Sequence, residues 1–195
     1  MSPEQAYLRY ITKVEKNSTN DYISTDRGRF ALLYNESQNR FIEWLLDNKR
    51  SDDIRYIKKL LVIDHPIKPV NKKDRATAAT PENYFDLSNV YAIGFDDCCK
   101  DQKIYLFPIR EENKNEVLQD ENNKPSFKYR ESPYTTADGK IIIFKEETTT
   151  FQKVLLSYYK KPVQIQLENP DNPESRFKNI ELDLPEITID RIISL

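Results

Sequence analysis

The chain has 195 residues, of which 38% are hydrophobic and 11% aromatic, enough for one substantial core or two small ones. Its 30 basic and 32 acidic residues nearly cancel, which excludes the strong global attraction to nucleic acid of a dedicated DNA-binding domain. No stretch approaches the roughly 20 apolar residues that span a bilayer, and the N-terminus lacks the layout of a secretory signal. We therefore expect a soluble protein made in a reducing cytoplasm, with no membrane partner.

The first third of the chain is predicted to be helical. Ser2, Pro3 and Gln5 supply an N-cap hydroxyl, a proline at the first helical position and a capping-box amide, so a helix should begin there. A second helix is expected over residues 27–47, and a third should be capped by Ser51 and ended by His65-Pro66. The predicted buried positions of these three helices are Tyr7, Ile11, Val14, Phe30, Leu33, Phe41, Trp44, Leu45, Ile54, Ile57 and Leu61.

From residue 67 the pattern changes to short strand-like segments. Residues 89–96 and 104–109 are rich in β-branched and aromatic side chains, whereas the charged segment at about 111–124 should be a short exposed helix or a mobile loop. Asp138-Gly139 lies between two strand-like runs and is the favoured two-residue hairpin turn, because both positions need positive φ.

Two more strands are expected after this hairpin. Residues 151–162 should form a strand with Val154, Leu156 and Tyr158 on one face, and residues 163–167 a fourth strand of an antiparallel meander.

A short apolar helix is predicted at the C-terminus. Asp183 and Glu186 have the spacing of a capping box, so this helix should start at about Leu184 and return to the N-terminal helices. The fold class is therefore α+β. Residues 1–66 and 183–195 are expected to form a helical bundle, with residues 67–182 inserted as an antiparallel β-sheet, a sandwich or half-barrel.

No catalytic constellation is visible along the chain. His65 is the only histidine, and at the expected helix end an imidazolium would meet the negative end of the dipole. Cys98 and Cys99 are adjacent and should pack as small, partly buried strand residues, since partner ligands are not present at zinc-site spacing. We expect a protein that is not an enzyme and that has no cofactor, no catalytic residues and no metal site.

The order of segments resembles the head-to-tail connector, or adaptor ring, proteins of tailed bacteriophages, most closely the ring proteins of crAss-like podoviruses. The residues that carry the resemblance are Tyr158 to Pro162, in the pattern Tyr-x-Lys-x-Pro, and Leu184 to Ile193, an acidic Leu-Pro-Glu segment leading into an Asp-x-Ile-Ile helix. The final helix of this chain is shorter than a connector's last helix often is.

This resemblance implies a virion structural protein in a homo-oligomeric ring, typically twelve-fold, located between portal and tail. Its partners would be other copies of itself, the portal, neighbouring connector or tail proteins, and DNA that passes through the lumen during genome ejection without specific binding. The residues that the resemblance suggests for the subunit or portal interface are Leu184, Glu186, Ile189, Ile192, Tyr158 and Tyr159. A weak DNA-facing surface is expected at Lys68, Lys72, Lys73 and Arg75.

The main alternative is a non-enzymatic, soluble protein-interaction domain of a phage or host accessory protein that forms no ring. A hydrolase ranks third. The genomic position of the gene discriminates the first two, because connector genes lie beside portal and capsid genes.

Overall fold

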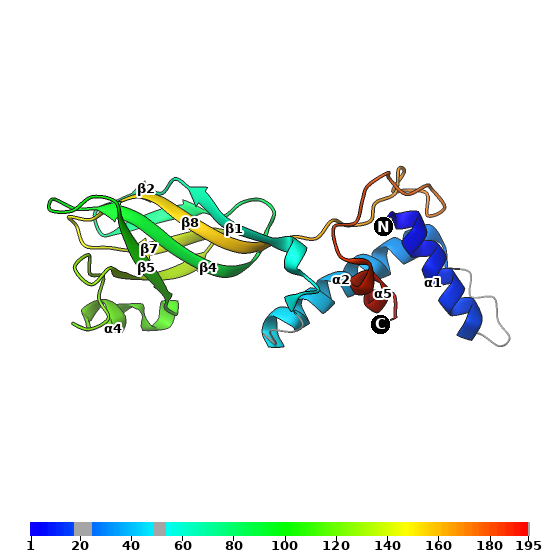
Figure 1. Cartoon of the computed structure of the whole chain (residues 1–195), viewed down its shortest axis with the longest axis horizontal. Helices are drawn as coiled ribbons and strands as arrows, with labels where there is room; N and C mark the ends of the chain where they lie inside the picture. Colours follow the sequence, from blue (N-terminus) through cyan, green and yellow to red (C-terminus); the bar gives the residue numbers. More distant parts are fainter. Residues whose placement is uncertain (18–24, 49–53, 195) are drawn as a thin grey trace. The chain divides into compact units, whose positions relative to one another are not determined.

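The computed structural model describes residues 1–17, 25–48 and 54–194, and its fold class is α+β, as expected (Figure 1). The chain divides into two compact units, a helical unit of Met1–Leu61 with Lys161–Leu195 and a sheet unit of Val62–Lys160. Both boundaries fall earlier than the predicted ones. His65 and Pro66 belong to a strand instead of a helix end, and residues 161–182 belong to the helical unit.

Helix α1 (Pro3–Asn17) begins at the predicted capping box. The Ser2 backbone amide donates to Gln5 Oε1 at 3.0 Å, and the Gln5 amide donates to Ser2 Oγ at 3.3 Å. Tyr7, Ile11 and Val14 are only half-buried, whereas Pro3 and Ala6 are buried. The buried side of this helix is therefore narrower and more N-terminal than predicted.

Helix α2 (Arg27–Asn48) is capped by Asp26, whose Oδ1 accepts the Arg29 amide at 2.6 Å. Leu33 and Trp44 were predicted to be buried, but 41% of Leu33 and 50% of Trp44 are exposed. The side chains of α2 that are buried are Phe30, Ala31, Tyr34, Gln38, Phe41, Ile42 and Leu45.

The predicted third helix does not continue to His65-Pro66. Its expected cap, Ser51, lies outside the described residues, and the chain from Lys58 to Leu60 is a single 3₁₀ turn, η1. Strand β1 (Leu61–Ile67) follows at once. Val62 and Ile63 are β-branched, and Pro66 is tolerated because β1 ends the strand order of the sheet.

The sheet unit is one eight-stranded mixed sheet that curls into a half-barrel, in the order β1-β8-β4-β5-β6-β7-β3-β2 (Figure 1). Its remaining strands are β2 (Val70–Asn71), β3 (Arg75–Ala79), β4 (Tyr84–Phe95), β5 (Gln102–Pro108), β6 (Glu131–Ala137), β7 (Lys140–Phe144) and β8 (Thr150–Lys160).

The predicted antiparallel meander over residues 134–167 does not form, because β7 pairs with β3 and β8 pairs with β4. The sheet is also not purely antiparallel, because β5 and β6 are parallel, with Tyr105 opposite Glu131. Parallel neighbours need a crossover connection. The charged segment supplies it with a 3₁₀ turn η2 (Glu111–Asn113) and the short helix α4 (Lys114–Gln119), which has no buried residue.

The hairpin between β6 and β7 is confirmed. Asp138 and Gly139 have φ of 50° and 66°, as this turn requires, and Ala137 pairs with Lys140. The predicted inward face of β8 is also confirmed. Val154, Leu156 and Tyr158 join the core of the half-barrel together with Ala76, Ala78, Val90, Ala92, Ile104, Leu106, Phe127, Tyr134, Ile141, Ile143 and Phe151.

Residues 163–167 form no strand of the sheet, so the fourth strand of the predicted meander was wrong. The Val163 amide donates to Asp183 Oδ1 at 3.1 Å, and a single bridge joins Leu167 to Phe177. Because Asp183 bonds to Val163, it does not cap the last helix. Helix α5 (Glu186–Ile192) begins after Pro185 with no side-chain cap.

Helix α5 packs on the N-terminal helices, which completes the bundle as predicted. Arg9 of α1 holds Asp190 with two hydrogen bonds of 2.9 and 3.0 Å. The buried hydroxyl of Thr188 donates to the Tyr56 carbonyl at 3.0 Å. The helical unit therefore joins the two ends of the chain around one apolar core.

Candidate interface surfaces

Most of the predicted interface residues are buried inside the subunit. Leu184, Ile189 and Ile192 lie in the core of the helical unit, at most 3% exposed, and Tyr158 and Tyr159 are buried in β8. Of the six residues only Glu186 is exposed, with Oε2 3.4 Å from Arg9. The buried five stabilise the subunit, so a partner would have to contact other residues.

A groove of about 850 Å³ lies on the helical unit between α2 and α5. Trp44 is 50% exposed and Ile187 is 57% exposed, and the Trp44 ring stacks on Phe41 with 6.2 Å between ring centroids. We call it the Trp44 groove; its lining is Lys13, Ser37, Arg40, Phe41, Trp44, Ile187, Asp190, Arg191 and Ser194.

The rim of the Trp44 groove is mainly basic. Lys13 Nζ donates to the Asp190 carbonyl at 3.1 Å and to Ser194 Oγ at 2.7 Å. The Arg191 guanidinium lies over the Tyr56 ring, 4.3 Å from its centroid. These contacts hold cationic side chains beside an exposed apolar floor, a composition typical of interface centres, where aromatic residues and Arg are enriched.

A second hollow, of about 550 Å³, lies where the loop after residue 167 meets the start of α2. The Gly28 amide donates to the Pro173 carbonyl at 2.8 Å, which holds the loop against α2. The two backbones approach closely at this point, since a Cβ on Gly28 would lie 3.0 Å from Pro173 Cα. Leu32 is 69% exposed beside it. We call this surface the Leu32 face; it comprises Gly28, Arg29, Leu32, Gln166, Leu167, Pro170, Pro173 and Lys178.

The two surfaces are separated on α2, since Trp44 and Leu32 are twelve positions apart and about 120° apart around the helix. At about 100° per residue, Trp44 and Leu32 fall on either side of the buried stripe that contains Phe30, Tyr34 and Phe41. Trp44 was predicted to lie in the buried stripe, and Leu32 was not among the predicted interface residues. A helical wheel centred on that stripe would have found both, since each is a large apolar residue outside it.

The predicted DNA-facing residues lie close together around β2. Lys68, Lys72 and Lys73 are exposed and Arg75 is half-buried at the start of β3. Lys73 pairs with Glu147, with 3.0 Å between Nζ and Oε1. The surface is therefore locally mixed in charge.

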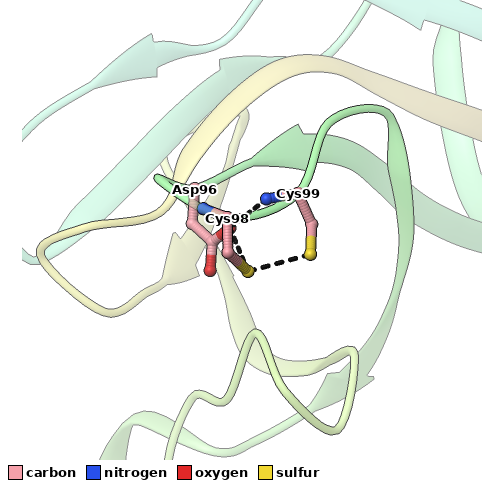
Figure 2. A group of neighbouring side chains, drawn as sticks. All are labelled: Asp96, Cys98 and Cys99. Atoms are coloured by element: carbon pink, nitrogen blue, oxygen red, sulfur yellow. Dashed lines mark hydrogen bonds between the residues drawn. The ribbon is translucent and has the colours of Figure 1, made fainter.

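Asp96, Cys98 and Cys99 come together in the loop between β4 and β5 (Figure 2). Both cysteines are free and exposed, so the prediction of partly buried strand residues was wrong. Asp96 Oδ1 accepts the amides of Cys98 and Cys99 at 3.1 and 2.9 Å and the Cys98 thiol at 3.2 Å. The two sulfurs are 2.8 Å apart.

Hydrogen bonding shifts the pKa values in this loop in opposite directions. Hydrogen bonds to Cys99 and then to Asp96 raise the pKa of the Cys98 thiol to about 12. Burial alone would raise the pKa of Asp96, but hydrogen bonds from the Cys98 thiol and the two cysteine amides outweigh it and lower that pKa. The loop therefore holds a protonated thiol beside a carboxylate.

His65 lies in β1, so the predicted role at a helix end was wrong. Its ring meets the Tyr158 ring edge-on, with 6.0 Å between centroids. The imidazole thus packs against an aromatic residue of the sheet unit.

Comparison of the chain with models of protein families finds no match, and a search of curated proteins finds no significant match. Among the residues that the structure describes, no helix combines the length and apolar character that crossing a membrane requires.

Proposed function

We propose that this chain is a virion structural protein that assembles head to tail into a homo-oligomeric connector ring between the portal and the tail of a bacteriophage. The observation that carries the ring is the pair of dissimilar apolar surfaces on either side of the buried stripe of α2, the Trp44 groove and the Leu32 face. The order of segments, which resembles that of connector proteins, carries the assignment to the virion.

A cyclic ring needs two different surfaces on each subunit. In a head-to-tail interface one surface meets the other surface of the next copy, and the angle between them sets the number of copies. Both surfaces are hollowed, but they differ in composition: the Trp44 groove is aromatic, whereas the Leu32 face presents an exposed leucine beside a proline loop. In the proposed ring, Leu32 of one copy enters the Trp44 groove of the next.

Charge supports this pairing. The groove is rimmed by Lys13, Arg40 and Arg191. The loop that forms part of the Leu32 face carries three exposed acidic side chains, Glu168, Asp171 and Glu174. Arg29 and Lys178 also line that face, so the acidic loop is the part that offers the counter-charge.

The mixed surface around Lys68 and Lys72 suits a lumen through which DNA slides. Lysines next to Asp74 and Glu147 would touch passing phosphates without the strong, salt-dependent attraction of a basic patch. We assign this surface to weak contact with DNA, and assign the portal and neighbouring connector or tail proteins as further partners.

Native mass spectrometry of the full chain, alone and then mixed with the portal protein of the same genome, tests the proposal. We expect closed rings of one stoichiometry, either alone or on addition of the portal. A chain that stays monomeric under both conditions would overturn the portal-docked ring and favour the interaction-domain alternative.

A further inference from the structure

We propose that Asp96, Cys98 and Cys99 form a binding site for one thiophilic divalent cation, of the class of Zn²⁺ or Cd²⁺. Two thiols and a carboxylate project on the same side of the loop between β4 and β5 (Figure 2). Their ligand atoms all lie within 4.8 Å of one another. This site goes beyond the proposed ring, and neither proposal depends on the other.

The donor set matches the chemistry of such ions. Zinc is bound by cysteine thiolates at about 2.3 Å and by carboxylate oxygens at about 2.0–2.2 Å. Two thiolates on one tetrahedral ion are then roughly 3.7 Å apart, so the sulfurs, now 2.8 Å apart, must separate by a small rotation. Both side chains are exposed, and that rotation meets no packed core.

The Oδ2 atom of Asp96 can serve as a ligand for a cation. Every hydrogen bond described for its carboxylate goes to Oδ1, which accepts the Cys98 and Cys99 amides and the Cys98 thiol. Oδ2 remains as the metal ligand while Oδ1 keeps the two cysteines in place.

The loop is fixed at its base, which holds the three donors together before any ion binds. Gly94 pairs with Gln102, and the Asp96 amide donates to the Cys99 carbonyl at 3.1 Å. A Cβ on Gly94 would lie 2.9 Å from both Phe151 Cδ1 and the Thr150 carbonyl oxygen, so this end of β4 is tightly packed. A site that is held in place loses less entropy on binding.

Local charge also favours a cation. Asp97 and Asp101 are exposed in the same loop, where Lys100 is the one basic side chain between residues 96 and 101. On binding, each thiol would release its proton to solvent as a sulfur–metal bond forms, and no electrons are exchanged. Three protein ligands leave a fourth position for water, so the site is open in the manner of exchangeable zinc sites.

Titration of the reduced full chain with Cd²⁺ tests the site. Ultraviolet charge-transfer absorption reports cadmium–thiolate bonds, and native mass spectrometry reports stoichiometry; a phosphine reductant keeps the thiols free. We expect one Cd²⁺ per chain, loss of binding in the Cys98→Ser/Cys99→Ser variant, and at least about tenfold weaker binding in Asp96→Asn.

Asp97→Asn is the matched control, because it removes an adjacent exposed carboxylate outside the cluster, and its affinity should stay within about twofold of wild type. Asp96→Asn retains an oxygen that can accept the loop amides, so it separates ligation from loop shape. Equal cadmium binding by wild type and the double serine variant would overturn the site. So would Asp96→Asn and Asp97→Asn losing affinity equally.

Discussion

Asn35 on α2 and the main chain of Ile165 exchange two hydrogen bonds. Asn35 Nδ2 donates to the Ile165 carbonyl at 2.9 Å, and the Ile165 amide donates to Asn35 Oδ1 at 2.8 Å. A side-chain amide thus does what a neighbouring strand would do for an extended segment. Gln38 extends this arrangement with a 3.4 Å hydrogen bond to the Val163 carbonyl.

Replacing Asn35 by alanine should therefore weaken the helical unit. The substitution leaves a part-buried amide and carbonyl of Ile165 without partners, and we expect the free energy of unfolding to fall by about 2–3 kcal/mol. Urea denaturation measures the change. Glu36→Ala on the exposed side of the same helix is the control, expected within about 0.5 kcal/mol of wild type. Equal effects of the two variants would contradict the role of Asn35.

Two buried tyrosines should respond in opposite ways to loss of their hydroxyl. The Tyr34 hydroxyl is buried with no hydrogen-bond partner among the described residues, whereas the Tyr158 hydroxyl donates to Asn83 Oδ1 at 2.9 Å. For Tyr34→Phe we expect the free energy of unfolding either to stay the same or to rise by up to about 1 kcal/mol. For Tyr158→Phe we expect it to fall by about 1 kcal/mol. Thermal or urea unfolding of both variants checks this, and a destabilised Tyr34→Phe variant would refute it.

Tyr84 should make the protein sensitive to alkaline pH. Burial, and next the charge of Asp86, raise its pKa to about 12, from about 10 in the unfolded chain. The unfolded chain loses this proton first, so stability is fully present below about pH 10 and is lost as the pH rises through about 12. Urea unfolding at a series of pH values should show a shallower alkaline loss in Tyr84→Phe than in wild type.

The comparison with Tyr84→Phe is needed because Lys145 acts in the opposite direction. Burial lowers the pKa of this lysine, whose Nζ donates to the Thr149 carbonyl at 2.6 Å. Its contribution to stability therefore rises with pH toward the pKa of an unfolded lysine. Parallel pH profiles of wild type and Tyr84→Phe would contradict the assignment to Tyr84.

Features with a local cause could be predicted from the sequence. The capping box at Ser2 and the turn at Asp138-Gly139 depend on residues at most three positions apart, and both form as expected. The inward face of β8 was also predictable, because alternation along one strand determines which side chains share a face.

Features with a distant cause could not be predicted. Asp183 has the spacing of a capping residue, yet its carboxylate bonds to Val163, which is 20 positions away. Residues 163–167 look like a strand, but Asn35, 130 positions from Ile165, takes the place of a strand partner. Local sequence patterns could not reveal that Val163 binds Asp183 or that Asn35 binds the main chain of Ile165.

The candidate sites divide in the same way. The apolar residues chosen from the C-terminal helix were buried, because a stripe of isoleucines does not show whether it faces its own subunit or a partner. The cysteine pair was visible, but its exposure and its contact with Asp96 depend on where β4 ends and on how the loop turns. A helical wheel of α2 could have predicted that Trp44 and Leu32 lie outside the buried stripe.

Two complementary variants test the head-to-tail pairing most directly. Trp44→Ser removes the groove but keeps the Leu32 face, and Leu32→Ser does the reverse; Ile63→Ser, which replaces an exposed apolar residue of the sheet unit, is the control. The measurement is native mass spectrometry of an equimolar mixture of the Trp44 and Leu32 variants, under conditions in which wild type and Ile63→Ser form rings. We predict that each variant alone forms no ring and that the mixture forms dimers containing one copy of each, because only one intact interface remains. Rings formed by either variant alone, or a mixture that stays monomeric, would contradict the pairing of the Trp44 groove with the Leu32 face.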